Sequence, residues 1–402
     1  MNSPWSPLRV RIFRALWIAG LVSNIGTFMH IVAASWTMTT LSDSPTLVGL
    51  VQTAWAVPGF LLALYAGALA DIIDRRQLIA ITQLIALAVA GTLAILQWTD
   101  NLSIELLLVG TFLESVALTN AAPAFMALTP ELVGTERLAQ AIGLDAVSRN
   151  ISQSIGPALA GAIIAATNPG AVFALNAVSY IGIVIVVQKN KSGQSKVMRP
   201  DAINRVIREG IRYVIGLRQL RNVLIRLAIA LAATSALTSV LPVVARRSLH
   251  VSASGFGLLL GALGVGSVVA VWGLPRIRAK LPLEVIVLLS AALWSGGTAL
   301  LAATSNMWVA ILTLLVCGAS TMAMLNTLFS TFTIQLPNLL RGRGTSLAML
   351  MVWLGVAIGT FAWGAAASAF GVGNALLIAA VVNIVVALFN RIVLPLGEIE
   401  PS

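Results

Sequence analysis

The chain has 402 residues, of which 58% are hydrophobic and only 10% are charged. A soluble domain carries roughly 25% charged residues, so this composition excludes a water-soluble globular protein and indicates a membrane protein. The net charge of +11 then predicts basic cytoplasmic loops that contact anionic lipid headgroups, and no nucleic-acid partner.

Apolar stretches long enough to cross a bilayer, which takes roughly 20 residues, recur along the whole chain. Twelve spans are predicted, at residues 14–38, 46–69, 78–97, 102–126, 138–166, 170–188, 222–244, 254–274, 283–303, 307–332, 344–368 and 372–395. Most of them are joined by short turns, whereas a long basic stretch separates the sixth span from the seventh. Around residues 201–220 this stretch is predicted to form an amphipathic helix on the membrane surface.

The predicted fold is therefore an all-α membrane protein with two six-helix halves. The N-terminal half is expected at residues 1–188, a cytoplasmic basic linker at 189–221 and the C-terminal half at 222–402. With the N-terminus placed inside, Arg246 and Arg247 are the only basic residues that fall in outside connections. The positive-inside rule thus predicts that both termini are cytoplasmic.

Two pairs of loops repeat at a nearly constant distance along the chain. The basic turn at residues 71–76 recurs at 276–280, and the loop at 130–134 recurs at 337–342, both about 205 residues later. Homologous six-helix halves related by an axis along the membrane normal are a transporter architecture. The repeat therefore favours a transporter over a channel or a receptor.

The loop after the second span carries a recognisable motif. Its residues are Gly67, Ala68, Leu69, Ala70, Asp71, Ile72, Ile73, Asp74, Arg75 and Arg76. They resemble the major facilitator superfamily motif Gly-x-Leu-Ala-Asp-Arg-x-Gly-Arg-Arg/Lys, with departures at Ile72 and Asp74. Residues 130–133 and 156–161 look like the branch that includes enterobactin-type siderophore exporters and macrolide efflux pumps. The resemblance implies a transporter of the bacterial inner membrane, which we expect to be a monomer.

The resemblance also implies a cytoplasmic gate. In the family, the acid at position Asp71 faces the N-terminal end of the eleventh helix, where the helix dipole favours a carboxylate. Here that end lies near Arg343. The gate is thus predicted to comprise Gly67, Asp71, Arg75, Arg76 and Arg343. The alternative is that Arg75 and Arg76 serve only to set the topology.

A second motif lies in the middle of the fifth span. Gly156, Pro157 and Gly161 resemble the Gly-Pro-x-x-Gly-Gly motif of exporters and substrate/proton antiporters, with Ala160 and Ser152 departing from the pattern. A proline can kink the helix, and small residues let a neighbouring helix approach. The motif favours export over uptake, and ordinary helix packing is the alternative.

Ionisable residues inside a bilayer are costly and are functional by default. Glu114 lies roughly 18 Å along the fourth span from Leu102 and is predicted to be a proton-coupling or cation-binding site. The alternative is a structural ion pair. Asp145 and Arg149 can pair with each other one helical turn apart, or Arg149 can reach Glu114.

Other polar residues are expected to line a central cavity. Asn150 and Gln153 extend the polar face of the fifth span, and Asn120 follows Glu114 on the fourth. The resemblance adds Asn24 and Asn326, because the first and tenth helices line the cavity in the family. His30 is a weaker candidate for a proton site, since such a histidine more often only bonds its neighbours.

The predicted function is proton-coupled export of a siderophore or an amphipathic drug by alternating access. The alternatives are a nutrient uptake symporter and a non-transporting membrane scaffold or sensor. The sequence has no nucleotide-binding Gly-x-x-x-x-Gly-Lys-Ser/Thr motif, no metal-binding cluster and one cysteine, Cys317, so neither an enzyme nor a cofactor is expected. Basic residues considered for an anionic siderophore are Arg149, Arg226, Arg246 and Arg247, of which only Arg149 is expected to lie deep.

Overall fold

The computed structural model describes residues 3–189, 216–337 and 341–396. Within these ranges the chain is helical, with no strand. The long helices of the N-terminal half are α1 (Arg11–Leu41), α2 (Pro45–Ile72), α3 (Arg75–Trp98), α4 (Ile104–Val133), α5 (Leu138–Ala166) and α6 (Pro169–Lys189). Those of the C-terminal half are α8 (Arg218–Thr234), α9 (Ala236–Val243), α10 (Ala253–Arg278), α11 (Leu283–Ala303), α12 (Met307–Ile334), α13 (Arg341–Phe370) and α14 (Val372–Val393).

The helices follow the predicted spans closely, and the all-α fold is confirmed. The seventh span differs, because it is divided at Ser235 into α8 and α9 and ends in a π-helical turn, η3 (Val244–Ser248). Several helices also extend beyond the predicted apolar stretch, as α4 does to Val133. Most of the amphipathic helix predicted around 201–220 lies outside the described residues.

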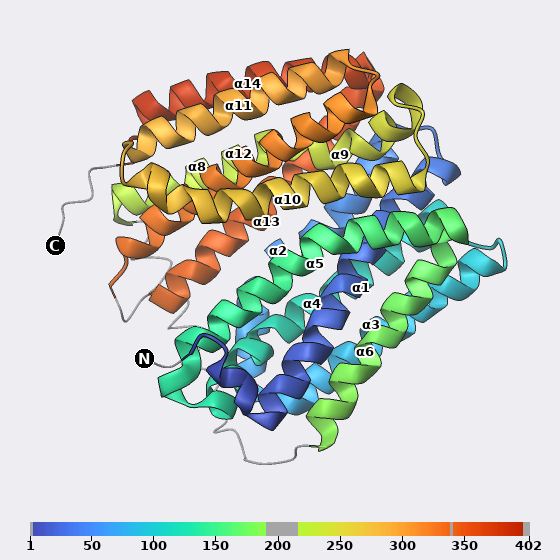
Figure 1. The fold of residues 1–402 in the computed structure, drawn as a ribbon, viewed down its shortest axis with the longest axis vertical. Coiled ribbons are helices and arrows are strands. Elements are labelled where there is room, and N and C mark those ends of the chain that lie inside the picture. The colour runs from blue at the N-terminus through green and yellow to red at the C-terminus, as the bar shows by residue number, and fades with distance from the viewer. Residues whose placement is uncertain (1–2, 190–215, 338–340, 397–402) are drawn as a thin grey trace.

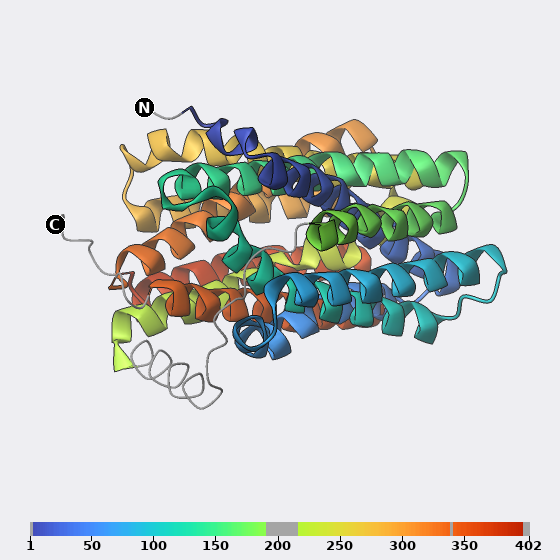
Figure 2. The ribbon, with the colours of Figure 1, turned by 90° about the horizontal axis from the view of Figure 1, so that it is seen from below.

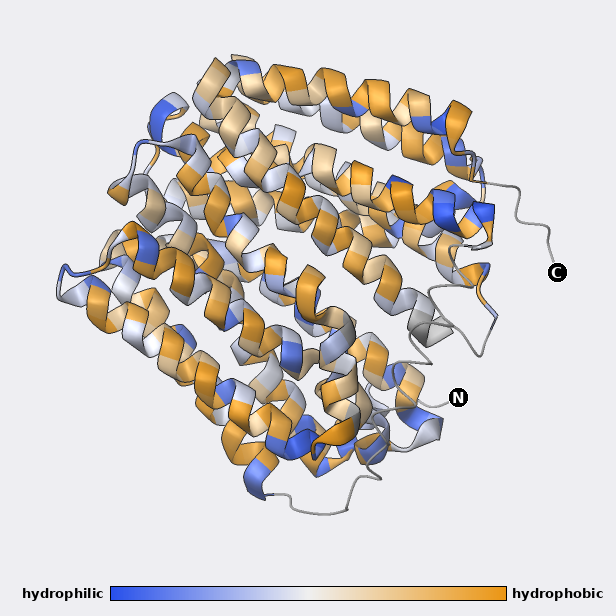
Figure 3. Cartoon of the chain, turned by 180° about the vertical axis from the view of Figure 1, so that it is seen from behind, coloured by the Kyte–Doolittle hydropathy of each residue, from blue (hydrophilic) through white to orange (hydrophobic). Residues whose placement is uncertain are grey.

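Eleven helices of the described chain are long and apolar enough to cross a membrane, with α8, α9 and η3 counted as one. Helix α5 is also 29 residues long, but it is not among them because its first half carries the polar residues predicted above. Most helical residues are hydrophobic, and hydrophilic residues are more frequent toward the helix ends (Figure 3). The protein is therefore a multi-pass membrane protein.

The two halves are distinct groups of helices, α1–α6 and α8–α14 (Figure 1). Seen from below, their helices lie side by side along one common direction (Figure 2). We call the face where α1 begins and α14 ends the terminal face, and the opposite face, where α1 ends at Leu41, the distal face. The terminal face is the one predicted to be cytoplasmic.

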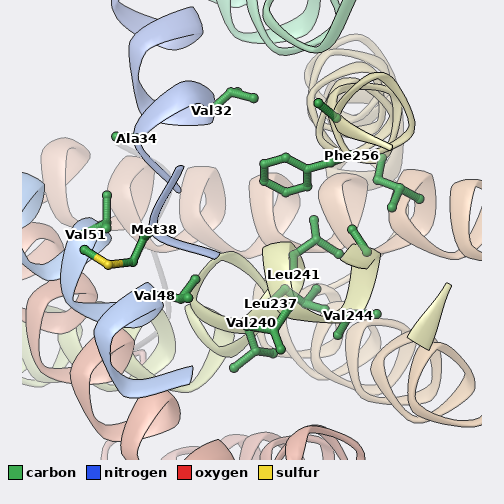
Figure 4. Close-up of a cluster of buried hydrophobic side chains, with 14 of the residues drawn as sticks. Val32, Ala34, Met38, Val48, Val51, Leu237, Val240, Leu241, Val244 and Phe256 are labelled. Carbon is green, nitrogen blue, oxygen red and sulfur yellow. The ribbon is translucent and has the colours of Figure 1, made fainter. Parts of the chain in front are cut away.

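The halves pack together through α2 against α13 and α5 against α10. A large hydrophobic cluster includes residues of both halves, such as Val32 and Met38 of α1, Val48 of α2, Leu237 of α9 and Phe256 of α10 (Figure 4). Two further hydrophobic clusters each lie within one half. One, in the N-terminal half, includes Leu16 and Leu78, and the other, in the C-terminal half, includes Leu220 and Leu336. Helices α5 and α10 converge toward the distal face and diverge toward the terminal face (Figure 1).

Polar contacts reinforce the distal end of this interface. Thr46 and Ser368 share a hydrogen bond of 2.7 Å between their hydroxyl groups. Arg246 donates to the backbone carbonyl of Thr39, one of the last carbonyls of α1, where the helix dipole favours a cation. Nη2 of Arg247 lies 2.5 Å from Oδ1 of Asp43. These bonds hold the two halves together at the distal face.

Candidate functional site

A carboxylate is buried in the middle of the N-terminal half. Glu114 lies about 15 Å along α4 from its first residue, and none of its side chain is exposed. Its Oε1 accepts hydrogen bonds from Nδ2 of Asn176 and from the hydroxyl of Tyr180, each 2.7 Å long. Both donors share one face of α6, because residues four apart are neighbours on a helix.

His30 of α1 completes this cluster. Its Nδ1 lies 3.0 Å from Oε2 of Glu114, and both side chains are fully buried. The two atoms are close but not aligned as a hydrogen bond, and neither imidazole nitrogen has a hydrogen-bond partner among the described residues. The ring lies 4.9 Å from that of Phe173 and 6.5 Å from that of Trp55, measured between centroids. The histidine thus brings a second ionisable group against the buried carboxylate, beside two aromatic rings.

Small residues make this arrangement possible. A Cβ atom at Gly26 of α1 would lie 2.7 Å from Oδ1 of Asn176, closer than real contacts allow. The glycine therefore lets α6 approach α1 and bring Asn176 toward Glu114. Thr27, the next residue, lies 3.4 Å from the Tyr180 hydroxyl oxygen and adds a further polar contact.

The charged pair predicted on α5 lies elsewhere. Arg149 forms an ion pair with Asp145 one turn away, and their side chains are 64% and 53% exposed. The structure thus decides between the two pairings considered for Arg149, because Glu114 is surrounded by His30 and neutral donors instead. Arg149 is also not the deep cation that the sequence suggested.

The other predicted polar residues make separate local contacts. Nδ2 of Asn24 lies 3.4 Å from Oγ of Ser148, and Asn120 donates to a backbone carbonyl of its own helix. Asn150 accepts a hydrogen bond at its backbone carbonyl, from Ser154. The backbone of Gln153 packs against Gly264 of the opposite half, and Asn326 accepts a hydrogen bond from Arg278. None of these contacts joins them to the Glu114 cluster.

The exporter-like motif of α5 lies at the contact between the halves. A Cβ atom at Gly161 would lie 2.5 Å from the backbone oxygen of Ala253, and one at Gly257 would clash with the backbone oxygen of Pro157. Gly156 faces α1 instead, where a Cβ would lie 2.8 Å from that of Phe28. The motif therefore allows close backbone packing of α5 against both α10 and α1.

The gate motif is described only in part. Arg75 forms an ion pair with Glu131 near the end of α4. Nη1 of Arg76 is buried without a hydrogen-bond partner among the described residues. A Cβ at Gly67 would meet nothing within 4 Å. The side chains of Asp71 and Arg343 lie outside the described residues.

The motif's departure at Asp74 has a visible structural role. Its carboxylate accepts hydrogen bonds from the backbone amides of Arg76 and Gln77, and so caps the start of α3. Asp is among the residues preferred at this position, because it satisfies amides that the helix leaves unpaired.

Arg226 is the deep cation of the C-terminal half. Only 1% of it is exposed, and its guanidinium binds both oxygens of Glu284 at 2.6 and 2.8 Å. It also donates to the backbone oxygen of Leu394, which follows α14. This corrects the expectation that Arg149 alone is deep, and it assigns Arg226 to an internal ion pair.

Asn176 and Tyr180 were not singled out from the sequence. The available signal was their spacing, since they place two polar side chains four residues apart in an otherwise apolar span. Nothing in the sequence identifies Glu114 as their partner, because the contact depends on how α6 packs beside α4. Among the described residues, no three His, Cys, Asp or Glu side chains form a metal-binding group.

Comparison with known proteins identifies the family. Residues 2–401 match the major facilitator family described as "Transmembrane secretion effector". The chain belongs to this family. It is 24% identical, over 63% of its length, to the staphyloferrin A transporter of Staphylococcus aureus, and 23% identical, over 44%, to macrolide efflux protein A of Streptococcus pyogenes. These matches span 64% and 43% of the two relatives, which is less than two thirds of their length.

Solved transporter structures share the fold. A bacterial homologue of the human lysosomal transporter Spinster, in an inward-facing and occupied conformation, superposes with a TM-score of 0.78 at 14% identity, covering 98% of this chain and 97% of that one. A bacterial homologue of the iron transporter ferroportin, in the inward-facing state, gives a TM-score of 0.69 at 19% identity, covering 94% and 98%. The chain thus belongs to a major facilitator family by sequence and shares the fold of these structures.

Proposed function

We propose that this transporter is a proton-coupled exporter of small molecules that works by alternating access in the cell inner membrane. The observation that supports proton coupling is the buried Glu114, whose partners are His30 and two neutral donors. A buried carboxylate with a fixed cation beside it is held in its charged form. Among the described residues no lysine or arginine lies within ion-pair distance of Glu114, and we take the His30–Glu114 pair as the proton-coupling site.

Proton exchange would alter the helix contacts at this site. Hydrogen bonds to a charged acceptor are stronger than bonds to a neutral one. Protonation of Glu114 therefore weakens its bonds to Asn176 and Tyr180. Because these bonds connect α4 to α6, and His30 lies on α1, protonation changes the packing among three helices of one half.

The register of α2 against α13 supports a gate at the terminal face. Gly59 lies against Trp353, and Thr53 lies 2.8 Å from Thr360 between hydroxyl oxygens. The two helices run antiparallel. Twelve residues after Gly59 on α2 is Asp71, and twelve residues before Trp353 on α13 is Arg341, so these two positions lie at the same level. A closed terminal face would therefore bring Asp71 near the residues around Arg343, as the motif predicts.

Alternating access also requires the distal contacts to separate. The bonds of Arg246 to Thr39 and of Arg247 to Asp43 join the halves at that face, as does the close packing of Gly161 on α10. This packing and the divergence of α5 and α10 toward the terminal face (Figure 1) fit an inward-facing state. The state is inward-facing because we take the terminal face, with both termini, to be cytoplasmic, as the loop charges predict.

The proposed substrates are siderophores or amphipathic drugs such as macrolides, by analogy with the two relatives named above. Purified protein in liposomes with a trapped pH-sensitive dye tests the proposal, with siderophores and macrolides added one at a time. Glu114→Gln keeps the size of the side chain but cannot ionise. Glu105→Gln is the matched control, because Glu105 is an exposed carboxylate near the start of the same helix.

We expect substrate-dependent proton movement in the wild type and in Glu105→Gln, and its loss in Glu114→Gln. Proton movement that persists in Glu114→Gln would remove Glu114 from the coupling role. Transport of labelled substrate without proton movement would contradict proton coupling and leave export intact. Substrate accumulation driven with the proton gradient, in the direction of the proton, would instead identify an uptake symporter.

A further inference from the structure

Arg278, the last residue of α10, donates hydrogen bonds to three neutral side chains of α12. Its Nη2 lies 3.1 Å from Oδ1 of Asn326 and 3.3 Å from Oγ1 of Thr327, and its Nη1 lies 3.4 Å from Oγ of Ser330. Asn326 is about 12 Å along α12 from its end at Ile334. The guanidinium thus reaches about two helical turns into the bundle from the terminal face.

The corresponding turn of the N-terminal half has a different partner. There Arg75, between the second and third spans, pairs with Glu131 on the fourth span of its own half. Arg278 likewise lies where the second span of its half ends, and it likewise contacts the fourth span. On that helix, however, it meets an amide and two hydroxyl groups. No carboxylate lies within ion-pair distance of Arg278 in the part of the chain that the structure describes.

Of the four other arginines considered for an anionic substrate, three are paired with carboxylates. Arg226 binds both oxygens of Glu284, Arg149 pairs with Asp145, and Arg247 pairs with Asp43. An arginine whose charge is matched internally offers little attraction to a second anion. Arg246, the fourth, donates to the backbone carbonyl and the hydroxyl of Thr39 at the distal face. Arg278 differs from the three paired arginines because its neutral partners orient the guanidinium without cancelling its charge, and it differs from Arg246 because it lies at the terminal face.

A partly buried guanidinium with neutral partners suits an anionic group. Its charge is incompletely solvated, its bonds to Thr327 and Ser330 are long, and its Nε is buried without a hydrogen-bond partner. Charge-assisted bonds from arginine to a carboxylate are shorter and stronger than these, and two can form in parallel. A ligand carboxylate that took the place of Ser330 or Asn326 as hydrogen-bond acceptor would therefore bind the Arg278 guanidinium more strongly than those side chains do.

We infer that Arg278, oriented by Asn326, Thr327 and Ser330, binds a carboxylate group of the transported molecule at the terminal face. The inference rests on the proposed transport function and gives the substrate class as small organic anions with one or more carboxylates. Asn326, expected from the sequence to line the cavity, then acts as the residue that positions Arg278.

The test measures equilibrium binding of radiolabelled citrate to the purified full chain in phosphatidylcholine nanodiscs, without any gradient. Arg278→Gln removes the charge, and Arg276→Gln is the matched control, since Arg276 is exposed and lies on the same last turn. Asn326→Asp is the second variant, because it places a carboxylate beside Arg278 and neutralises it without removing it.

We expect citrate binding to weaken roughly tenfold or more in Arg278→Gln and in Asn326→Asp, and to stay within about twofold of the wild type in Arg276→Gln. Equal weakening in Arg276→Gln would overturn the inference, because it would show a general attraction of basic residues. Unchanged binding in Arg278→Gln, or in Asn326→Asp when that variant is folded, would overturn it as well. Absence of citrate binding to the wild type would contradict it too.

Two further comparisons separate the sources of the anion. If phosphatidylglycerol added to the nanodiscs abolishes citrate binding through Arg278, the site belongs to a lipid headgroup and the substrate assignment is wrong. Citrate binding that persists in that lipid supports the assignment. The binding assay needs no gradient and is therefore independent of transport. If citrate binds through Arg278 but the protein moves no substrate in liposomes, the proposed export is wrong and the anion site stands. Export of a macrolide together with citrate binding independent of Arg278 would contradict the anion site alone.

Discussion

The two halves of the protein surround their buried charged groups differently. In the C-terminal half, Arg226 binds both oxygens of Glu284, so two opposite charges neutralise each other. In the N-terminal half, Glu114 is buried about 15 Å from the start of α4, beside His30 and neutral donors. An arginine beside a buried carboxylate favours its charged form, and Glu114 has no arginine or lysine partner among the described residues. The comparison therefore assigns a structural ion pair to the C-terminal half, and it is the reason we propose proton coupling in the N-terminal half.

The turns at the terminal face reverse this pattern. Arg75 of the N-terminal half is paired with Glu131, whereas Arg278 of the C-terminal half contacts only neutral side chains on α12 among the described residues. The buried acid Glu114 and the partly buried base Arg278 thus both have neutral hydrogen-bond donors or acceptors around them. We propose a proton as the partner of the first and an anion as the partner of the second.

The largest expected effect is on stability, from breaking the ion pair of the C-terminal half. Glu284→Ala leaves Arg226 buried without its partner and should lower the free energy of unfolding by about 3–5 kcal/mol, measured by denaturant unfolding in detergent micelles. Replacing the pair by Arg226→Met with Glu284→Leu should restore most of that stability. A single variant as stable as the wild type would contradict a structural role for the pair.

A smaller effect is expected from the N-terminal half. Tyr180→Phe removes one hydrogen bond to Glu114 and should cost about 1.5–3 kcal/mol if the carboxylate is charged. The same unfolding measurement applies, with Tyr65→Phe as the control because Tyr65 is exposed. If Tyr180→Phe lowered the free energy of unfolding as much as Glu284→Ala does, the proposed difference between the two halves would be contradicted.

The contact between the halves should respond to added volume. Gly257→Val puts a side chain where Pro157 of the opposite half already lies, and overpacking typically costs about 1–3 kcal/mol. We expect the distal ends of α5 and α10 to separate, as measured by distances between spin labels on the two helices. Gly273→Ala, on the same helix with nothing within 4 Å of its Cβ, should leave the distances unchanged.

The smallest effect is expected at the distal face. Arg247→Gln breaks an ion pair with the fully exposed Asp43 side chain, and exposed ion pairs contribute little to stability. The same spin-label distances should shift only slightly toward the open distal state, and the shift should shrink at high salt. A shift as large as that of Gly257→Val would show that Arg247 dominates the distal contact.

Much of the fold was determined by the sequence alone. A span must be apolar over the thickness of a bilayer and must satisfy its backbone polar groups internally, so each apolar stretch was bound to be a helix. This is why the α11 bounds, Leu283–Ala303, match the predicted span. The division of the seventh span at Ser235 was not predicted, because its hydropathy continues without interruption.

The partners of the buried charges were decided only by the tertiary structure. The sequence identified Glu114 as a costly intramembrane acid but left its partner open, because lateral packing of helices leaves little trace in hydropathy. The close approach of α6 at Gly26 placed Asn176 and Tyr180 beside it, and α1 supplied His30. In the same way, only the packing of α10 on α12 gave Arg278 neutral partners. Spacing along one helix fixes which residues share a face, and the neighbouring helix decides what that face meets.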